Sequence, residues 1–169
     1  SHGPADFLEH CLHVSTQMLV LGKCAPDLDS ARRMAEAAIT SGQAFEKFRV
    51  LVSAQGGDLT YIDFPEKFPQ ARFIELVKAS QAGNLSQVHA RKIGEASVSL
   101  GAGRTRKGDP VDHAVGLMIH CKVGDKVEKD QPLYTIFAND STRLVQVRES
   151  LWPAFEWSVE KVPALPLFY

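Results

Sequence analysis

Residues 114–137 read AVGLMIHCKVGDKVEKDQPLYTIF, and this stretch decides how the second half of the chain folds. Its first apolar run, Ala114 to Cys121, is nearly continuous and is typical of a buried strand. A polar segment follows, in which Gly124-Asp125 predicts a turn. The second apolar run, Gln131 to Phe137, predicts another strand. The second half of the protein is therefore expected to be rich in β-structure.

Further elements are expected on both sides of this stretch. They are strands over 73–78 and 85–88 separated by Gly83, a short helix over 91–100, and a last helix that begins at Asp140 or Ser141. We expect Pro153 to end or kink that last helix, and we interpret Phe155 and Trp157 as residues of the helix that pack against the sheet. The tail, residues 162–169, alternates apolar residues with prolines, which predicts an edge strand or an ordered extension.

The first third of the chain has a helical pattern. Apolar residues at helical spacing predict three helices, one from Pro4 to Gly22, a second from Asp27 or Asp29 to Ser41-Gly42, and a third from Ala44 to Gln55. All three are short, so none is expected to be stable alone. The sequence changes character from Phe64 onward, which indicates a boundary between two subregions.

The composition excludes several classes of protein. The 169 residues carry 19 Lys and Arg against 20 Asp and Glu, a formal net charge of −1, so we expect neither nucleic-acid nor membrane binding. The three cysteines stand in no metal-binding pattern and are interpreted as reduced thiols, and we expect a cytoplasmic protein. The chain begins with Ser1-His2 rather than Met, and we expect it to be a fragment of a longer protein.

Residues suited to catalysis are scattered along the chain. His10 and His13 share one helical face, but no carboxylate or thiolate completes a site around them, and His89 and His113 flank loops without a visible acidic partner. His120 ends an apolar run and is expected to be satisfied within the fold. These patterns predict neither a catalytic nor a metal site.

The loop GAGRTRKG at residues 101–108 is the one segment that could contact an anion. Glycines expose backbone N–H groups, and three cationic side chains lie close by. It lacks an acid or base partner, so we favour a structural or interdomain loop over an anion site. Gly101 and Gly103 are both expected to adopt backbone conformations that other residues reach only with strain.

An ordered set of motifs resembles one known family. The set comprises LVSAQGGD at 51–58, LGAGR at 100–104, Lys107, Asp112, AVGL at 114–117 and KVGD at 122–125, with GPAD at 3–6 and IFAND at 136–140 in agreement. In this order it resembles the C-terminal part of the pyrimidine-nucleoside phosphorylases, the group that includes thymidine phosphorylase. The resemblance covers nearly the whole chain.

The resemblance implies an α+β fold in two parts. Residues 1–70 would be a helical part of the family's large α/β domain. Residues 71–169 would be the C-terminal module, a small β-rich barrel-sandwich hybrid with a C-terminal helix.

The resemblance also implies a pentosyltransferase of pyrimidine nucleoside salvage. Such an enzyme converts thymidine or uridine and phosphate into the free base and a pentose 1-phosphate, with phosphate as co-substrate and no cofactor, and acts as a homodimer. In the family, the groups that hold phosphate and base lie upstream of the segment matching Gly3-Pro4. No residue here is therefore assigned a catalytic, substrate-binding or metal-binding role. The partner would be the remainder of the phosphorylase chain, and the isolated chain would be inactive.

Residues 122–133, KVGDKVEKDQPL, also resemble the biotinyl and lipoyl carrier modules. Those carriers need a lysine at an exposed hairpin tip, and the equivalent residues here are Ala138-Asn139-Asp140-Ser141. The alternative is thus a carrier-like β module that acts as a noncatalytic interaction domain. A third interpretation, a partner-binding protein that uses the 101–108 loop or the tail, has no support in a particular motif.

Overall fold

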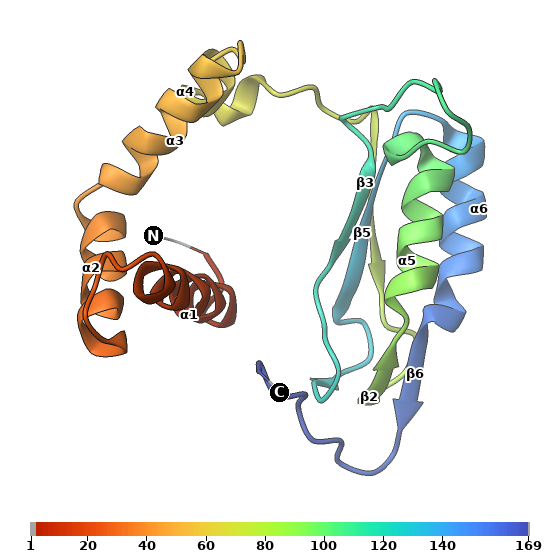
Figure 1. Cartoon of the computed structure of the whole chain (residues 1–169). Helices are drawn as coiled ribbons and strands as arrows, with labels where there is room; N and C mark the ends of the chain where they lie inside the picture. Colours follow the sequence, from red (N-terminus) through yellow and green to blue (C-terminus); the bar gives the residue numbers. More distant parts are fainter. Residues whose placement is uncertain (1–2, 169) are drawn as a thin grey trace. The chain divides into compact units, whose positions relative to one another are not determined.

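The computed structural model describes residues 3–168, which form two compact units (Figure 1). Ser1 and His2, and Tyr169 at the end of the tail, lie outside the described residues. The first unit comprises the described residues up to Lys67 together with Leu167 and Phe168, and the second runs from Phe68 to Pro166. No helix among residues 3–168 is long and apolar enough to cross a membrane.

The first unit is helical. Its elements are α1 (Ala5–Leu21), α2 (Leu28–Thr40), α3 (Gln43–Ala54), the short α4 (Thr60–Asp63) and the 3-10 turn η1 (Pro65–Lys67). The Asp27 side chain caps α2 by accepting a hydrogen bond from the Ser30 N–H at 2.7 Å. Gly42 has a φ of 81°, so the chain turns sharply between α2 and α3. The three longer helices confirm the sequence prediction.

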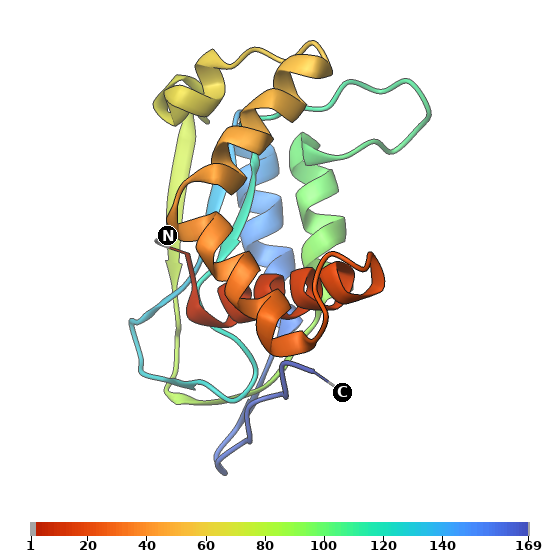
Figure 2. The ribbon, with the colours of Figure 1, turned by 60° about the vertical axis from the view of Figure 1, so that its left-hand side comes forward.

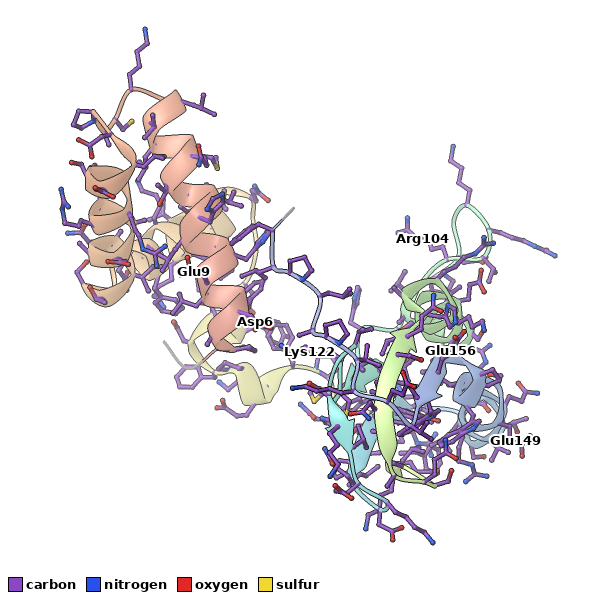
Figure 3. The ribbon with its side chains drawn as sticks, turned by 90° about the horizontal axis from the view of Figure 1, so that it is seen from below. Asp6, Glu9, Arg104, Lys122, Glu149 and Glu156 are labelled. Atoms are coloured by element: carbon purple, nitrogen blue, oxygen red, sulfur yellow. The ribbon has the colours of Figure 1, made fainter. Side chains whose placement is uncertain are left out.

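Helices α1 and α2 are joined by an ion pair and a small core. Both terminal nitrogens of the Arg32 guanidinium donate to the Glu9 carboxylate at 2.7 Å, and Glu9 on α1 is labelled in Figure 3. This pairing lowers the pKa of Glu9. The buried residues of these two helices are mostly small: Leu12, Thr16, Ala31 and Ala35. The helical unit therefore buries little apolar surface within itself.

The second unit, the β module, contains two three-stranded antiparallel sheets and two helices. Its elements are β1 (Phe73–Lys78), β2 (Gly83–Val88), α5 (Ala90–Ser97), the π-helical turn η2 (Val98–Ala102), β3 (Gly116–Ile119), β4 (Lys126–Val127), β5 (Pro132–Ala138), α6 (Ser141–Leu151), the 3-10 turn η3 (Trp152–Ala154) and β6 (Phe155–Ser158). The strand orders are β1-β5-β3 and β4-β2-β6. The predicted mixed α+β fold is confirmed.

Strand β5 is the centre of the module. Leu133, Tyr134 and Ile136 are fully buried, and the Tyr134 ring stacks on Phe155 with ring centroids 5.5 Å apart. Helices α5 and α6 lie side by side against this sheet (Figure 1). Helix α6 contributes Leu144, Val147 and Leu151 to the core. The module thus has one continuous apolar core under its two helices.

Two strand predictions need correction. The run Ala114 to Cys121 was expected to be a buried strand, but only Gly116–Ile119 is extended, it lies at a sheet edge, and Met118 is 53% exposed. Gly83, expected to separate two strands, is itself the first residue of β2, where it pairs with Val127.

Helix α6 ends at Leu151, close to Pro153, which was expected to end or kink it. Phe155 and Trp157 were expected on this helix, and this is wrong, because both residues lie on β6, which pairs with β2. Proline lacks an N–H and cannot donate a backbone hydrogen bond of the helix, so the chain continues as the 3-10 turn Trp152–Ala154. Beyond Ser158 the described part of the tail contains no strand, so it is an extension rather than an edge strand.

Gly101 and Gly103 differ from each other. Gly101 has a φ of 112°, as expected, but Gly103 has an extended φ of −148°, so the expected special conformation is wrong there. At Gly103 the constraint is space, because a Cβ atom would lie 2.7 Å from Cγ2 of Val98. At Gly101 a Cβ atom would have no contact closer than 3.5 Å, so the constraint is conformational.

We expect Gly101→Ala to lower the free energy of unfolding of the β module by about 1–2 kcal/mol, because alanine reaches a positive φ only with strain. Gly94→Ala is the matched control, since Gly94 lies inside α5 with open space around its Cα. That change should raise stability by about 0.5–1 kcal/mol. Urea denaturation followed by fluorescence of Trp152 and Trp157 measures both. Equal stability of the two variants would contradict the argument.

Candidate functional site

A polar cluster lies where β5 ends, β1 begins and α6 starts. We call Asp112, Asn139 and Asp140 the Asn139 cluster. The Asn139 side-chain oxygen accepts a hydrogen bond from the Arg72 N–H at 2.8 Å, and its amide nitrogen donates to Asp112 Oδ2 at 2.7 Å. The other oxygen of Asp112 accepts from the Ala114 N–H at 3.0 Å. One side chain therefore ties β1 to the loop that precedes β3.

Backbone geometry brings the loop to this cluster. Gly101, at its positive φ, turns the chain at the end of η2, and its carbonyl accepts a hydrogen bond from the Asp112 N–H at 2.9 Å. On the other side, Asp140 is extended and caps α6, because its Oδ1 accepts from the N–H groups of Thr142 at 2.8 Å and Arg143 at 2.9 Å. The loop is thus held here by a backbone hydrogen bond, and the start of α6 by a side-chain cap.

Hydrogen bonding keeps the carboxylates of the cluster ionised. The amide of Asn139 lowers the pKa of Asp112, with further lowering by the Ala114 N–H. The Arg143 and Thr142 N–H groups lower the pKa of Asp140. Both carboxylates accept hydrogen bonds from neighbouring groups within the module, Asp112 through both of its oxygens and Asp140 through Oδ1. Neither is poised to exchange a proton near neutral pH.

The loop between η2 and β3 projects beyond the end of α5 (Figure 2). Asp109 fixes its shape, since Oδ2 accepts from the Thr105 hydroxyl and the Arg106 N–H, both at 2.7 Å. Arg104, labelled in Figure 3, donates through Nε to the Asp109 carbonyl at 3.1 Å. The loop is therefore organised by its own bonds, which accords with the structural interpretation of the 101–108 segment.

A shallow hollow of about 440 Å³ lies between this loop and α6. Gly101, Pro110 and Arg143 line it together with the Asn139 cluster. Arg143 is exposed, and two bonded carboxylates stand beside it. An anion in this hollow would face Asp112 and Asp140 as well as Arg143, so the electrostatics do not favour an anion site there.

The histidines differ from one another in their surroundings. His89 was expected to lack an acidic partner, and this is wrong, because its Nε2 lies 2.7 Å from Oε1 of Glu156. The two residues are 67 positions apart and meet only because β2 pairs with β6. His120 is satisfied as expected, with its Nε2 2.8 Å from the Thr135 hydroxyl. His10 and His13 both lie against the ring of Phe168.

Two further kinds of side chain could form a functional site in the described part of the chain, metal ligands and cysteine thiols. Within residues 3–168, no three His, Cys, Asp or Glu side chains are arranged to hold a metal ion. All three cysteines are free thiols, and burial raises the pKa of Cys121. The sequence analysis did not predict the structural role of Asn139 or its hydrogen bond to Asp112. Both lie in motifs of the family resemblance, but their contact spans 27 residues.

Comparison with known proteins identifies the β module. Residues 84–157, which include the projecting loop and the Asn139 cluster, match the family described as pyrimidine nucleoside phosphorylase C-terminal domain. The chain is homologous to the C-terminal part of the pyrimidine-nucleoside phosphorylases. The resemblance inferred from the sequence motifs is confirmed.

Individual phosphorylases extend the match into the helical unit. The pyrimidine-nucleoside phosphorylase of Geobacillus stearothermophilus is 39% identical over 167 residues, which cover 99% of this chain and 38% of that protein. The corresponding proteins of Bacillus subtilis and Staphylococcus aureus strain USA300 are 47% and 44% identical over 137 residues, 81% of this chain and 32% of each relative. The chain therefore spans about a third of the length of these phosphorylases.

The residues that correspond to the lysine-bearing hairpin tip of a carrier module include two members of the Asn139 cluster. Asn139 and Asp140 are bonded within the module, whereas a carrier needs a mobile, exposed lysine at that point. Of the lysines in the 122–133 segment, Lys126 pairs with Glu128 at 2.9 Å. The arrangement thus favours the phosphorylase relationship over the carrier alternative.

We expect Asn139→Ala to lower the free energy of unfolding by about 1–2 kcal/mol at pH 7, because it removes two hydrogen bonds, of which the one to Asp112 is partly buried. Asn139 lowers the pKa of Asp112, so its contribution is present above the ordinary pKa of a carboxyl group and is lost as the pH falls through the pKa of the folded state. The difference from the parent should therefore shrink below about pH 4. Gln70→Ala, which removes one exposed local bond, is the control. A pH-independent difference would contradict this account.

We expect biotin and lipoate ligases to leave every lysine of this chain unmodified, because none occupies the carrier position. Co-expression with each ligase, followed by intact-mass measurement, tests this, with a natural biotin carrier domain as the positive control. A stoichiometric adduct on Lys122, Lys126 or Lys129 would support the carrier alternative.

Proposed function

We propose that this chain is the C-terminal portion of a pyrimidine-nucleoside phosphorylase and that it supports the reaction without supplying catalytic residues. The reaction would be cleavage of a pyrimidine nucleoside by phosphate to give the free base and a pentose 1-phosphate. The observation that carries the proposal is a helical unit with a largely uncovered apolar surface, in a chain that spans 38% of its Geobacillus stearothermophilus relative.

The uncovered surface centres on a groove of about 720 Å³ formed by α1, α2 and the start of α3. Met18, Leu19, Met34 and Ile39 contribute its larger side chains. Met18 is 66% exposed and Met34 is 45% exposed. Contiguous apolar surface of this kind marks an interface. We infer that it packs against the portion of the phosphorylase that precedes this chain.

The supporting role follows from how the polar groups are used. The side chains of Asp109, Asp112 and Asn139 all form hydrogen bonds within the β module. Groups held in this way fix the shape of a loop and a sheet end. Phosphorolysis needs phosphate aligned with the anomeric carbon, a departing base stabilised as an anion, and water excluded. In this proposal the preceding portion supplies those groups, and this chain supplies rigid backing.

The same proposal carries the remaining expectations from the family resemblance. The full enzyme would be a cytoplasmic homodimer that uses phosphate as co-substrate and needs no cofactor. Its substrate would be thymidine, uridine or both.

A chimera tests the proposal. The part of the Geobacillus stearothermophilus phosphorylase that matches this chain is replaced by this chain, and release of free base from thymidine or uridine with phosphate is followed by chromatography. We expect turnover by the chimera and none by the 169-residue chain alone. Turnover by the chain alone would refute the supporting role, and a folded but inactive chimera would refute the phosphorylase assignment.

Variants of the helical unit test whether its groove is covered in the longer protein. We expect Met34→Lys to lower the melting temperature of the chimera while leaving that of the isolated chain nearly unchanged, because Met34 would be buried only in the longer protein. Val159→Lys is the control, since Val159 is 98% exposed.

A further inference from the structure

One face of the β1-β5-β3 sheet is covered by helices and the other is open. Glu75 accepts a hydrogen bond from Arg148 of α6 at 3.2 Å, so the side chains in line with Glu75 point toward the helices. Successive side chains of a strand alternate between the two faces of a sheet. Ile74 and Leu76 on β1 therefore point away from the helices, as do their partners in register, Phe137 and Thr135.

The open face is apolar across all three strands. Leu76 pairs with Thr135, and Thr135 pairs with Met118 of β3. Ile74 pairs with Phe137, which pairs with Gly116. We call Ile74, Leu76, Met118 and Phe137 the open sheet face. Three of them are strongly exposed, Ile74 at 59%, Met118 at 53% and Leu76 at 48%.

The polar group at the centre of this face needs no external partner. Thr135 is only 8% exposed, and its hydroxyl lies 2.8 Å from Nε2 of His120. An antiparallel sheet with one solvated face normally presents polar residues on that face. Here isoleucine, leucine and methionine stand instead, so the open sheet face has the character of an interface.

We propose that the open sheet face is a docking surface for an apolar surface of the preceding portion of the same phosphorylase. The inference rests on the proposed function and assigns a second contact, separate from the groove of the helical unit. The Geobacillus stearothermophilus relative has most of its length outside the match, since this chain covers 38% of it. A longer phosphorylase thus holds enough additional chain to cover both surfaces.

Size favours a covalently linked occupant over a second copy. The open sheet face consists of four side chains, whereas a stable interface between separate proteins takes about 20–30 residues a side. A segment of the same polypeptide avoids most of the entropy loss of association, so a small apolar contact suffices to hold it. The absence of a charged side chain among the four also fits an apolar occupant rather than a polyanion.

The three methionines make the two contacts separately measurable. Met18 and Met34 line the groove of the helical unit, and Met118 lies on the open sheet face, and all three are exposed. Peroxide oxidises exposed methionine to the sulfoxide, so the rate at each position reports its accessibility. Mass spectrometry of peptides gives the three rates in the isolated chain and in the active chimera.

We expect oxidation of Met118 to slow by about tenfold or more in the chimera relative to the isolated chain. If Met118 reacts equally fast in both while Met18 and Met34 are protected and the chimera turns over, the docking inference is wrong and the proposed function stands. If none of the three is protected and the chimera is inactive, the proposed function itself fails. Protection of Met118 already in the isolated chain would also overturn the inference. If that protection depended on protein concentration, it would indicate that a second copy covers Met118. If it did not depend on concentration, it would indicate that the chain's own helical unit covers Met118.

A pair of variants provides a second readout. Leu76→Lys should lower the melting temperature of the chimera and leave that of the isolated chain within a few degrees. Val145→Lys is the matched control, because Val145 is an exposed apolar residue on α6. Equal effects of Leu76→Lys on chimera and isolated chain would count against docking at this face.

Discussion

Burial of strand β5 is the constraint on which the β module depends. Every residue from Leu133 to Ile136 is buried, so the strand needs a neighbouring strand on each edge and helices packed against the sheet. Strands β1 and β3 provide the edges, and α6, which starts three residues after β5 ends, covers one side. Tyr134 shows the consequence: burial raises its pKa to about 12, and its hydroxyl donates to the Arg148 carbonyl at 3.4 Å. The phenol is thus kept neutral and bonded.

The Asn139 cluster is a direct result of where β5 ends. Asn139 is the first residue after the strand, so its side chain is delivered to the point where β1 begins. From there its amide reaches Asp112, and the backbone of Asp112 is bonded to Gly101. Three segments that are distant in sequence are held together by one side chain and one glycine turn. This accounts for how a long loop between η2 and β3 is anchored at both of its ends.

Local signals in the sequence predicted most of the elements, and long-range pairing accounts for what they missed. Asp27 and Asp140 were both proposed as helix caps, and both accept the expected backbone hydrogen bonds. Strand β6 was missed because the last helix was extended past Pro153. Phe155 and Trp157 stand two positions apart, which is the spacing of a strand rather than of one helical face, and both residues pair with β2. The contacts of His89 with Glu156 and of Asn139 with Asp112 could not be predicted, because each joins residues brought together by the sheets.

The proposed supporting role draws on the distribution of polar and apolar groups in the β module. A catalytic site keeps ionisable groups partly unbonded so that they can act on a substrate, and this carries a cost in stability. In the β module the carboxylates of Asp109, Asp112 and Asp140 are bonded to neighbouring groups, while leucine, isoleucine and methionine side chains remain uncovered on the open sheet face. Hydrogen-bonded polar groups together with uncovered apolar faces are typical of a segment that packs against the rest of a larger protein. Covering those apolar faces would therefore stabilise the chain further through the hydrophobic effect.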